Sequence, residues 1–113
     1  MDKPTPRERV EHVLKAIHNI KDFTGESTLE QFQSDVKLQS AVQYQFLIIG
    51  EAIRHVDESI LSRYNYTWHI PRSFRNFIIH EYHGIKMVRI YHACHELEQL
   101  KNVMETILEK EFK

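Results

Sequence analysis

Apolar residues recur every three or four positions along most of this chain of 113 residues, which is the period of an α-helix. Turn-forming residues are scarce, with three glycines and three prolines, and this favours long helices over a sheet of many strands. We therefore expect an all-α fold, an antiparallel four-helix bundle with short connections. The expected helices extend over about Thr5 to Phe23, Ser34 to Glu58, Pro71 to Tyr82 and Ile85 to Glu109.

Glycine and proline positions add detail to this bundle. Pro71 is expected to begin the third helix, where its missing amide is harmless, and Gly84 is expected to end it. Gly50 lies inside the second helix, where it costs about 1 kcal/mol relative to alanine, so we expect another helix to pack closely there. The stretch 61–70 is expected to be an irregular connection that covers one end of the bundle with its aromatic residues Tyr64, Tyr66 and Trp68.

Composition limits the possible classes of protein. The length fits one domain, taken as residues 1–113. A single cysteine, Cys94, cannot form an internal disulfide, and the chain has neither a signal-like start nor an apolar run long enough for a membrane span, so we expect a cytoplasmic protein. The net charge of −1 argues against a broadly basic surface, yet basic residues outnumber acidic ones locally. That region holds Arg54, Arg63, Arg72, Arg75, Lys86 and Arg89 against Asp57, Glu58 and Glu81.

The third expected helix carries two different faces in the segment SFRNFIIHEYHG, residues 73–84. At about 100° per residue, Phe74, Phe77 and Ile78 fall in one apolar arc that suits the core. The remaining arc is mostly polar, with Ile79 as its apolar member. Its polar members are Arg72, Arg75, Asn76, His80, Tyr82 and His83.

This polar arc is open to two interpretations. A solvated helix face with a few capping groups is the simpler one. The combination of guanidinium, amide and imidazole, however, also suits phosphoryl transfer on RNA. Histidine exchanges protons with the ribose 2′-hydroxyl or the leaving oxygen near neutral pH, while arginine neutralises charge on the phosphate oxygens.

The spacing of these residues resembles a known family. Arg75 and His80 are separated by four residues, a polar residue follows the arginine, and Tyr82 stands two positions after the histidine. This pattern, with the run Ile48-Ile49-Gly50-Glu51-Ala52 on the second helix, resembles the HEPN superfamily of helical ribonucleases, and more narrowly the HepT-like toxins of toxin–antitoxin pairs. The similarity in helix order covers nearly the whole chain.

The resemblance implies a metal-independent endoribonuclease toxin that needs no cofactor and works as a homodimer, with two third helices facing one cleft. It implies that Arg75 and His80 are catalytic and that Asn76 supports them. It also implies that a nucleotidyltransferase antitoxin attaches AMP to Tyr82. The helical wheel agrees with a shared site, since Arg75 and His80 lie about 140° apart on one helix. Glu51 is a candidate supporting residue, although a surface or capping role is equally open.

Other interpretations compete with this one. The chain could be a non-catalytic partner that presents a nucleotide or substrate to a nucleotidyltransferase, or a purely structural dimer. Metal binding is not favoured, because the histidine pairs 80/83 and 92/95 match neither a structural zinc site nor a di-iron bundle. Cys94 falls on the apolar stripe of the fourth helix and is expected in the core.

Overall fold

The computed structural model describes residues 3–80 and 87–113. Within these residues the regular structure is entirely helical, which confirms the expected all-α bundle. The helices are α1 (Pro6–Thr24), α2 (Leu29–Ser34), α3 (Val36–Arg54), α4 (Glu58–Leu61), α5 (His69–Arg72), α6 (Phe74–His80), α7 (Met87–Cys94) and α8 (Glu98–Glu111).

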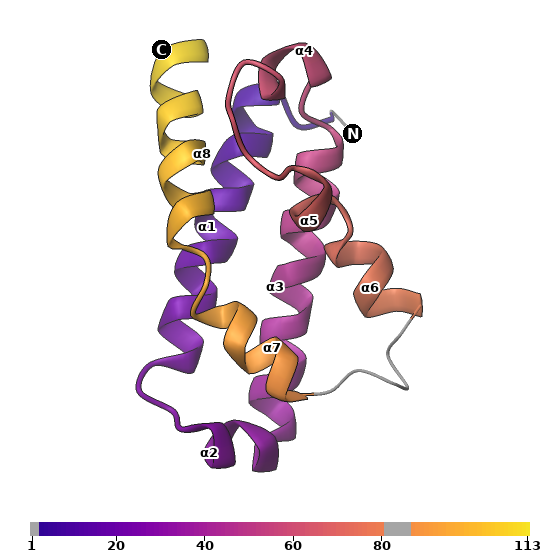
Figure 1. Cartoon of the computed structure of the whole chain (residues 1–113), viewed down its shortest axis with the longest axis vertical. Coiled ribbons are helices and arrows are strands. Elements are labelled where there is room, and N and C mark those ends of the chain that lie inside the picture. The colour runs from indigo at the N-terminus through magenta and orange to yellow at the C-terminus, as the bar shows by residue number, and fades with distance from the viewer. Residues whose placement is uncertain (1–2, 81–86) are drawn as a thin grey trace.

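The two longest helices, α1 and α3, run antiparallel and form the centre of the molecule (Figure 1). Helix α8 packs on α1, whereas α5 and α6 pack on α3, so α6 lies on the side of α3 away from α1 (Figure 1). Helix α2 turns the chain between α1 and α3 and contacts α7. Within residues 3–80 and 87–113, the main helical contacts of α6 are with α3 and α5.

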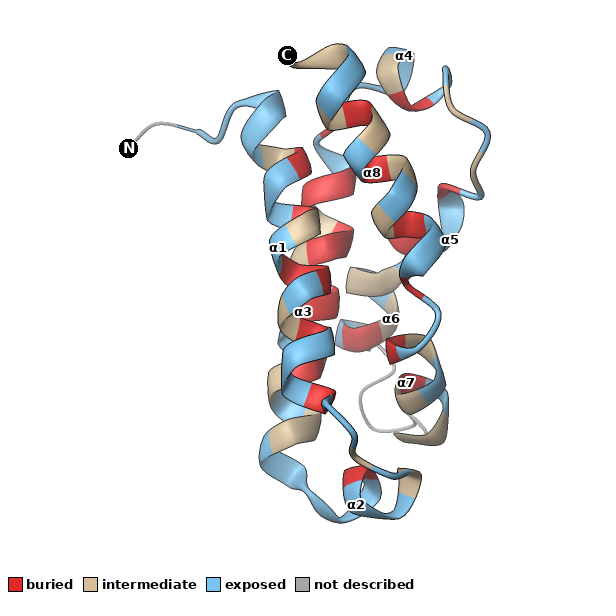
Figure 2. Ribbon diagram, turned by 90° about the vertical axis from the view of Figure 1, so that its left-hand side faces the viewer, coloured by how far each residue is buried: buried red, intermediate tan, exposed pale blue. Residues whose placement is uncertain are grey.

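The core lies along the facing sides of these helices. Figure 2 shows the buried residues as a band on α1, α3 and α8, with exposed residues on their outer sides. The buried positions of α1 include Val10, Val13, Ile17 and Ile20, each at most 1% exposed, and they follow the helical period that the sequence predicted. Cys94 is 4% exposed, which confirms its expected place in the core.

Helices α1 and α2 both begin with a capping box. Thr5 Oγ1 accepts from the Glu8 amide while the Glu8 carboxylate accepts from the Thr5 amide, and Thr28 and Gln31 make the same reciprocal pair. Helix α2 was not predicted from the sequence, although the spacing of Thr28 and Gln31 is typical of the start of a helix.

The second expected helix ends earlier than predicted, and the third is divided into two helices. Helix α3 ends at Arg54 instead of near Glu58, and a turn at residues 55–57 leads into the separate α4. The third expected helix is interrupted at Ser73, which separates α5 from α6. The prediction that Pro71 begins this helix is wrong, because α5 begins at His69 and Pro71 lies within its first turn. The Ser73 hydroxyl donates to the Ile70 carbonyl at 2.7 Å, so its side chain satisfies a carbonyl at the end of α5. The expected end of this helix at Gly84 lies outside the described residues.

The prediction of one continuous fourth helix is wrong. Residues 95–97 separate α7 from α8, and the chain changes direction there, so that α7 reaches α2 while α8 runs along α1 (Figure 1). Leu97, at the corner, is 4% exposed. The apolar spacing of three through Cys94, Leu97 and Leu100 fits a continuous helix equally well, so periodicity alone did not reveal the break.

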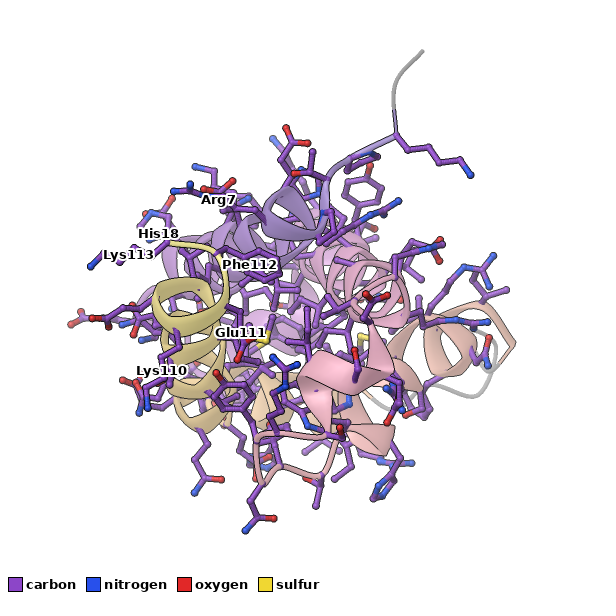
Figure 3. All side chains as sticks on the ribbon, turned by 90° about the horizontal axis from the view of Figure 1, so that it is seen from above. Arg7, His18, Lys110, Glu111, Phe112 and Lys113 are labelled. Carbon is purple, nitrogen blue, oxygen red and sulfur yellow. The ribbon has the colours of Figure 1, made fainter. Side chains whose placement is uncertain are left out.

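The aromatic connection packs over one end of the bundle, as predicted. Trp68 is 7% exposed, and its Nε1 donates to the carbonyls of Leu61 and Tyr64 at 3.0 and 3.2 Å. The Tyr64 hydroxyl donates to Glu111 at 2.7 Å, which ties the connection to the last turn of α8 seen end-on in Figure 3. Across residues 3–80 and 87–113, no helix combines the length and apolar character that crossing a membrane requires.

Candidate active site

The crossing of α3 and α6 at Gly50 positions the candidate site. A Cβ atom added to Gly50 would lie 2.7 Å from the backbone nitrogen of Arg75 and 3.3 Å from the Cβ of Phe74. Any side chain at this position would therefore collide with the first turn of α6. This confirms the predicted close approach of another helix at Gly50, and it brings Arg75 beside the last turns of α3.

Glu51 lies between two basic side chains at this crossing. Its Oε1 is 3.4 Å from Nε of Arg75, and its Oε2 accepts a hydrogen bond from Nε2 of His55 at 3.0 Å. The Arg75 side chain is 41% exposed, so solvent and a ligand still reach it. The carboxylate thus links α3 to α6 and restricts the orientation of the Arg75 guanidinium without enclosing it.

The surroundings of Glu51 keep it ionised. The hydrogen bond from His55, with the nearby charges of Arg75 and Arg54, lowers the pKa of Glu51 below the usual value for a glutamate. Because the carboxylate is stabilised as an anion, it remains a charged partner for Arg75 at neutral pH. The structure therefore brings together two of the residues selected from the sequence, Glu51 and Arg75.

The other selected residues follow on or after α6. Asn76 is exposed and directly follows Arg75. His80 is the last residue of α6, and its side chain is not described. Tyr82 lies outside the described residues, so its expected role stays a prediction.

The apolar face of α6 packs toward the bundle as predicted. Ile78 is 6% exposed, and the ring of Phe74 meets that of Phe46 edge-on at 5.1 Å between centroids. Phe77 lies under the guanidinium of Arg89, which is 5.1 Å from the ring centroid and ties α6 to α7. Ile79 is 40% exposed on the opposite side. The predicted separation of an apolar and a polar face is confirmed for the part of α6 that the structure describes.

His55 is a contact of the site that was not predicted from the sequence. Glu51 and His55 are four residues apart on a helix, a spacing that places their side chains on one face, so the pair was detectable in principle. The contact between Glu51 and Arg75 was not detectable in this way, because it depends on how α6 crosses α3.

A metal site finds no support in the described part of the chain. Within residues 3–80 and 87–113, no three histidine, cysteine, aspartate or glutamate side chains are grouped so that they could hold a metal ion. The pair at 80 and 83 involves His83, which lies outside those residues.

Comparison with known proteins places the chain in a family. Residues 13–107 match the family model described as ribonuclease HepT-like. The chain is 33% identical over 86 residues to a proposed RNase of Methanocaldococcus jannaschii, covering 75% of this chain and 71% of the relative. It is 28% identical over 109 residues to a proposed RNase of Caldanaerobacter subterraneus, covering 95% of this chain and 97% of the relative.

A third relative carries the family's own name. The chain is 28% identical over 107 residues to a protein of Thermococcus cleftensis named as a proposed ribonuclease HepT, covering 93% of this chain and 97% of the relative. No solved structure matches the chain significantly. On the strength of the family match, which spans most of its length, this chain belongs to the ribonuclease HepT-like family.

Proposed function

We propose that this protein is a metal-independent endoribonuclease whose catalytic residues are Arg75 and His80. The observation that carries the proposal is the Arg75 guanidinium, held by Glu51 yet 41% exposed, on the same short helix as His80. Such a positioned cation stabilises negative charge that grows on a phosphate. The ribonuclease HepT-like family match and the ribonuclease names of the relatives support the same reaction class.

The proposed reaction uses the RNA's own 2′-hydroxyl as nucleophile. Its oxygen attacks the adjacent phosphorus, the bond from phosphorus to the 5′-oxygen breaks, and a 2′,3′-cyclic phosphate and a 5′-hydroxyl result. His80 takes the proton from the 2′-hydroxyl or donates one to the leaving oxygen. Arg75 neutralises the charge on the non-bridging oxygens, and Asn76 donates a hydrogen bond to the phosphate.

We further propose that the active form is a homodimer in which α6 of one protomer faces α6 of its partner. The exposed side of α6, away from α1, is free of the other long helices of the described chain and supports this arrangement (Figure 1). Arg75 and His80 lie about 140° apart on one helix. Both groups reach the same phosphate more easily if each protomer contributes one of them.

Cleavage of RNA in the presence of a chelator tests the proposal. The wild-type protein should cut RNA and leave DNA of the same sequence intact, and Arg75→Ala and His80→Ala should each abolish cleavage while keeping the helical content. Matched controls are Arg7→Ala and His18→Ala, which lie on the opposite side of the molecule from α6 (Figure 3) and should cut normally. Full activity in both site variants, or no cleavage by the wild type, would contradict the proposal.

The same experiment addresses the alternative of a non-catalytic partner for a nucleotidyltransferase. A passive partner would leave RNA intact and would not arrest growth when it is expressed alone. A toxin should cut RNA and arrest growth, since an unregulated endoribonuclease degrades cellular RNA. We propose the toxin role on the basis of the family match.

Neutralisation is proposed to act at Tyr82. A nucleotidyltransferase antitoxin would join the phenol oxygen to the α-phosphorus of ATP, with release of pyrophosphate and of the phenol proton. An added AMP would bring bulk and negative charge close in sequence to His80, and so oppose an incoming RNA phosphate. Intact mass after co-expression with such an enzyme should increase by one adenylyl group, and Tyr82→Phe should remove the increase.

A further inference from the structure

A hollow lies beside the candidate active site, between the end of α3 and the junction of α5 with α6. Its volume is about 310 Å³, and it is lined by Arg54, His69, Arg72, Ser73 and Asn76. A single water needs only about 10–15 Å³ measured in this way, so the hollow accommodates a considerably larger polar group. Asn76 directly follows Arg75, which places the hollow next to the catalytic arginine.

The lining of this hollow is basic. It contains two guanidinium groups and no carboxylate, while the hydroxyl of Ser73 and the amide of Asn76 supply neutral hydrogen-bonding groups. Among the described residues, Arg54 has no ion-pair partner within 4.0 Å. The guanidinium of Arg72 is engaged, because it pairs with Glu58.

A second hollow of about 550 Å³ continues the first. It shares Arg54 and Arg72 with it and adds His55, Asp57 and Glu58 to the polar lining. Acidic groups therefore line only this second hollow, whereas the first hollow, beside Asn76, is lined by the same two arginines without them. The Glu58 side chain is 70% exposed, so it can swing away from Arg72 into solvent at low cost.

We propose that the first hollow binds a second backbone phosphate of the RNA strand, next to the scissile one, through Arg54 and Arg72. This inference rests on the proposed ribonuclease function. No carboxylate lines this hollow, and its two guanidinium groups suit the oxygens of a phosphodiester. Glu58 acts as an internal competitor that occupies Arg72 until a phosphate displaces it.

Binding of uncleavable RNA tests this subsite separately from the reaction. A single-stranded oligoribonucleotide with 2′-O-methyl riboses lacks the attacking hydroxyl, so its affinity can be followed by fluorescence anisotropy over a range of salt concentrations. Arg54→Gln should weaken binding several-fold and reduce the slope of log K against log salt by about 0.7, the value for one lost phosphate contact on a single strand.

Glu58→Gln is a variant that should bind RNA more tightly, an effect that misfolding cannot produce. It removes the competitor and frees Arg72, so it should tighten binding and steepen the salt dependence. The matched controls are Lys21→Gln and Glu98→Gln, which alter an ion pair of 3.0 Å between α1 and α8, away from α5 and α6. Each control changes the net charge as its counterpart does, and both should leave affinity close to that of the wild type.

The outcomes separate this subsite from the proposed function. Cleavage by the wild type with unchanged RNA affinity in Arg54→Gln and Glu58→Gln would overturn the subsite and leave the ribonuclease proposal intact. Binding that responds to these two variants without any cleavage would support the subsite and reject the enzyme. If the Lys21 and Glu98 controls changed RNA affinity as much as the site variants do, the change would be due to net charge and the subsite proposal would be wrong. The subsite proposal would also be wrong if the wild type did not bind the RNA.

Discussion

Glu51 is the described residue that pairs with the guanidinium of Arg75, the arginine proposed to be catalytic. Its carboxylate contacts Arg75 and His55 from opposite oxygens, at 3.4 and 3.0 Å. All three side chains are between 41% and 50% exposed, so the pairs contribute little to stability. Their significance is geometric: they restrict a flexible side chain whose position determines how well it meets a developing charge.

Glu51→Gln should therefore reduce cleavage without reducing RNA affinity. The amide retains the shape of the side chain but no longer attracts Arg75, so we expect the turnover rate to fall by about tenfold, the effect of losing roughly 1.4 kcal/mol of transition-state stabilisation. Loss of a negative charge near the site should leave binding of 2′-O-methyl RNA equal or tighter. Single-turnover cleavage and anisotropy measure the two effects.

The control for this variant is Glu105→Gln, which removes one charge from an exposed position on α8 and should behave as the wild type. Wild-type turnover in Glu51→Gln would show that Arg75 is positioned by other groups. Parallel losses of turnover and RNA affinity would instead point to a general structural role for Glu51.

At the scale of the helices, the crossing of α3 and α6 determines where the site forms. Gly50→Ala should destabilise the protein, although alanine is the better helix former by about 1 kcal/mol. The new Cβ would lie 2.7 Å from the backbone nitrogen of Arg75, and a backbone cannot rotate away as a side chain can. We expect a net loss of about 1–3 kcal/mol, measured by urea unfolding, together with reduced RNA cleavage as α6 is displaced.

Ser40→Ala is the matched control, since it introduces alanine at an exposed position of the same helix and should be neutral or stabilising. A Gly50→Ala variant as stable as Ser40→Ala would mean that α6 adapts to the added methyl group, and that the close crossing does not fix the position of Arg75.

The sequence predicted those features that depend on local periodicity. The buried faces of α1 and α3, the two faces of α6 and the close packing at Gly50 all follow from spacing, and the structure confirms them. The break between α7 and α8 could not be predicted in this way, because Leu97 fits the apolar stripe of a continuous helix and also fits a buried corner. Tertiary packing of α7 against α2 and of α8 against α1 selects the corner.

The candidate site was predictable to a similar extent. Helical spacing placed Arg75, Asn76 and His80 on one polar arc, while the family resemblance gave Arg75 and His80 their proposed roles. Glu51 was a candidate in the run on the second helix that resembles the family. The contact of Glu51 with Arg75 and the hollow between α3 and α5 depend on the path of the chain through residues 55–73. That stretch has no regular period, so its course is set by contacts distant in sequence, such as those of Trp68 and Tyr64.

At the scale of the whole molecule, the proposed dimer makes a prediction about mixed subunits. If each site combines Arg75 of one protomer with His80 of its partner, a heterodimer of Arg75→Ala and His80→Ala chains contains one site with both residues and one with neither. Two different affinity tags allow this heterodimer to be purified away from both homodimers. It should show about half of the wild-type activity, because one of the two symmetric sites remains complete.

The two homodimers are the built-in controls, since each lacks the same group in both sites and should be inactive. If both catalytic groups came instead from one protomer, each site of the heterodimer would lack one of them, and the purified heterodimer would be as inactive as the homodimers. Failure to recover any doubly tagged species would reject the dimer itself. Cleavage by the heterodimer therefore requires both a stable dimer and a site shared between its protomers. Neither single variant tested alone can demonstrate these two properties.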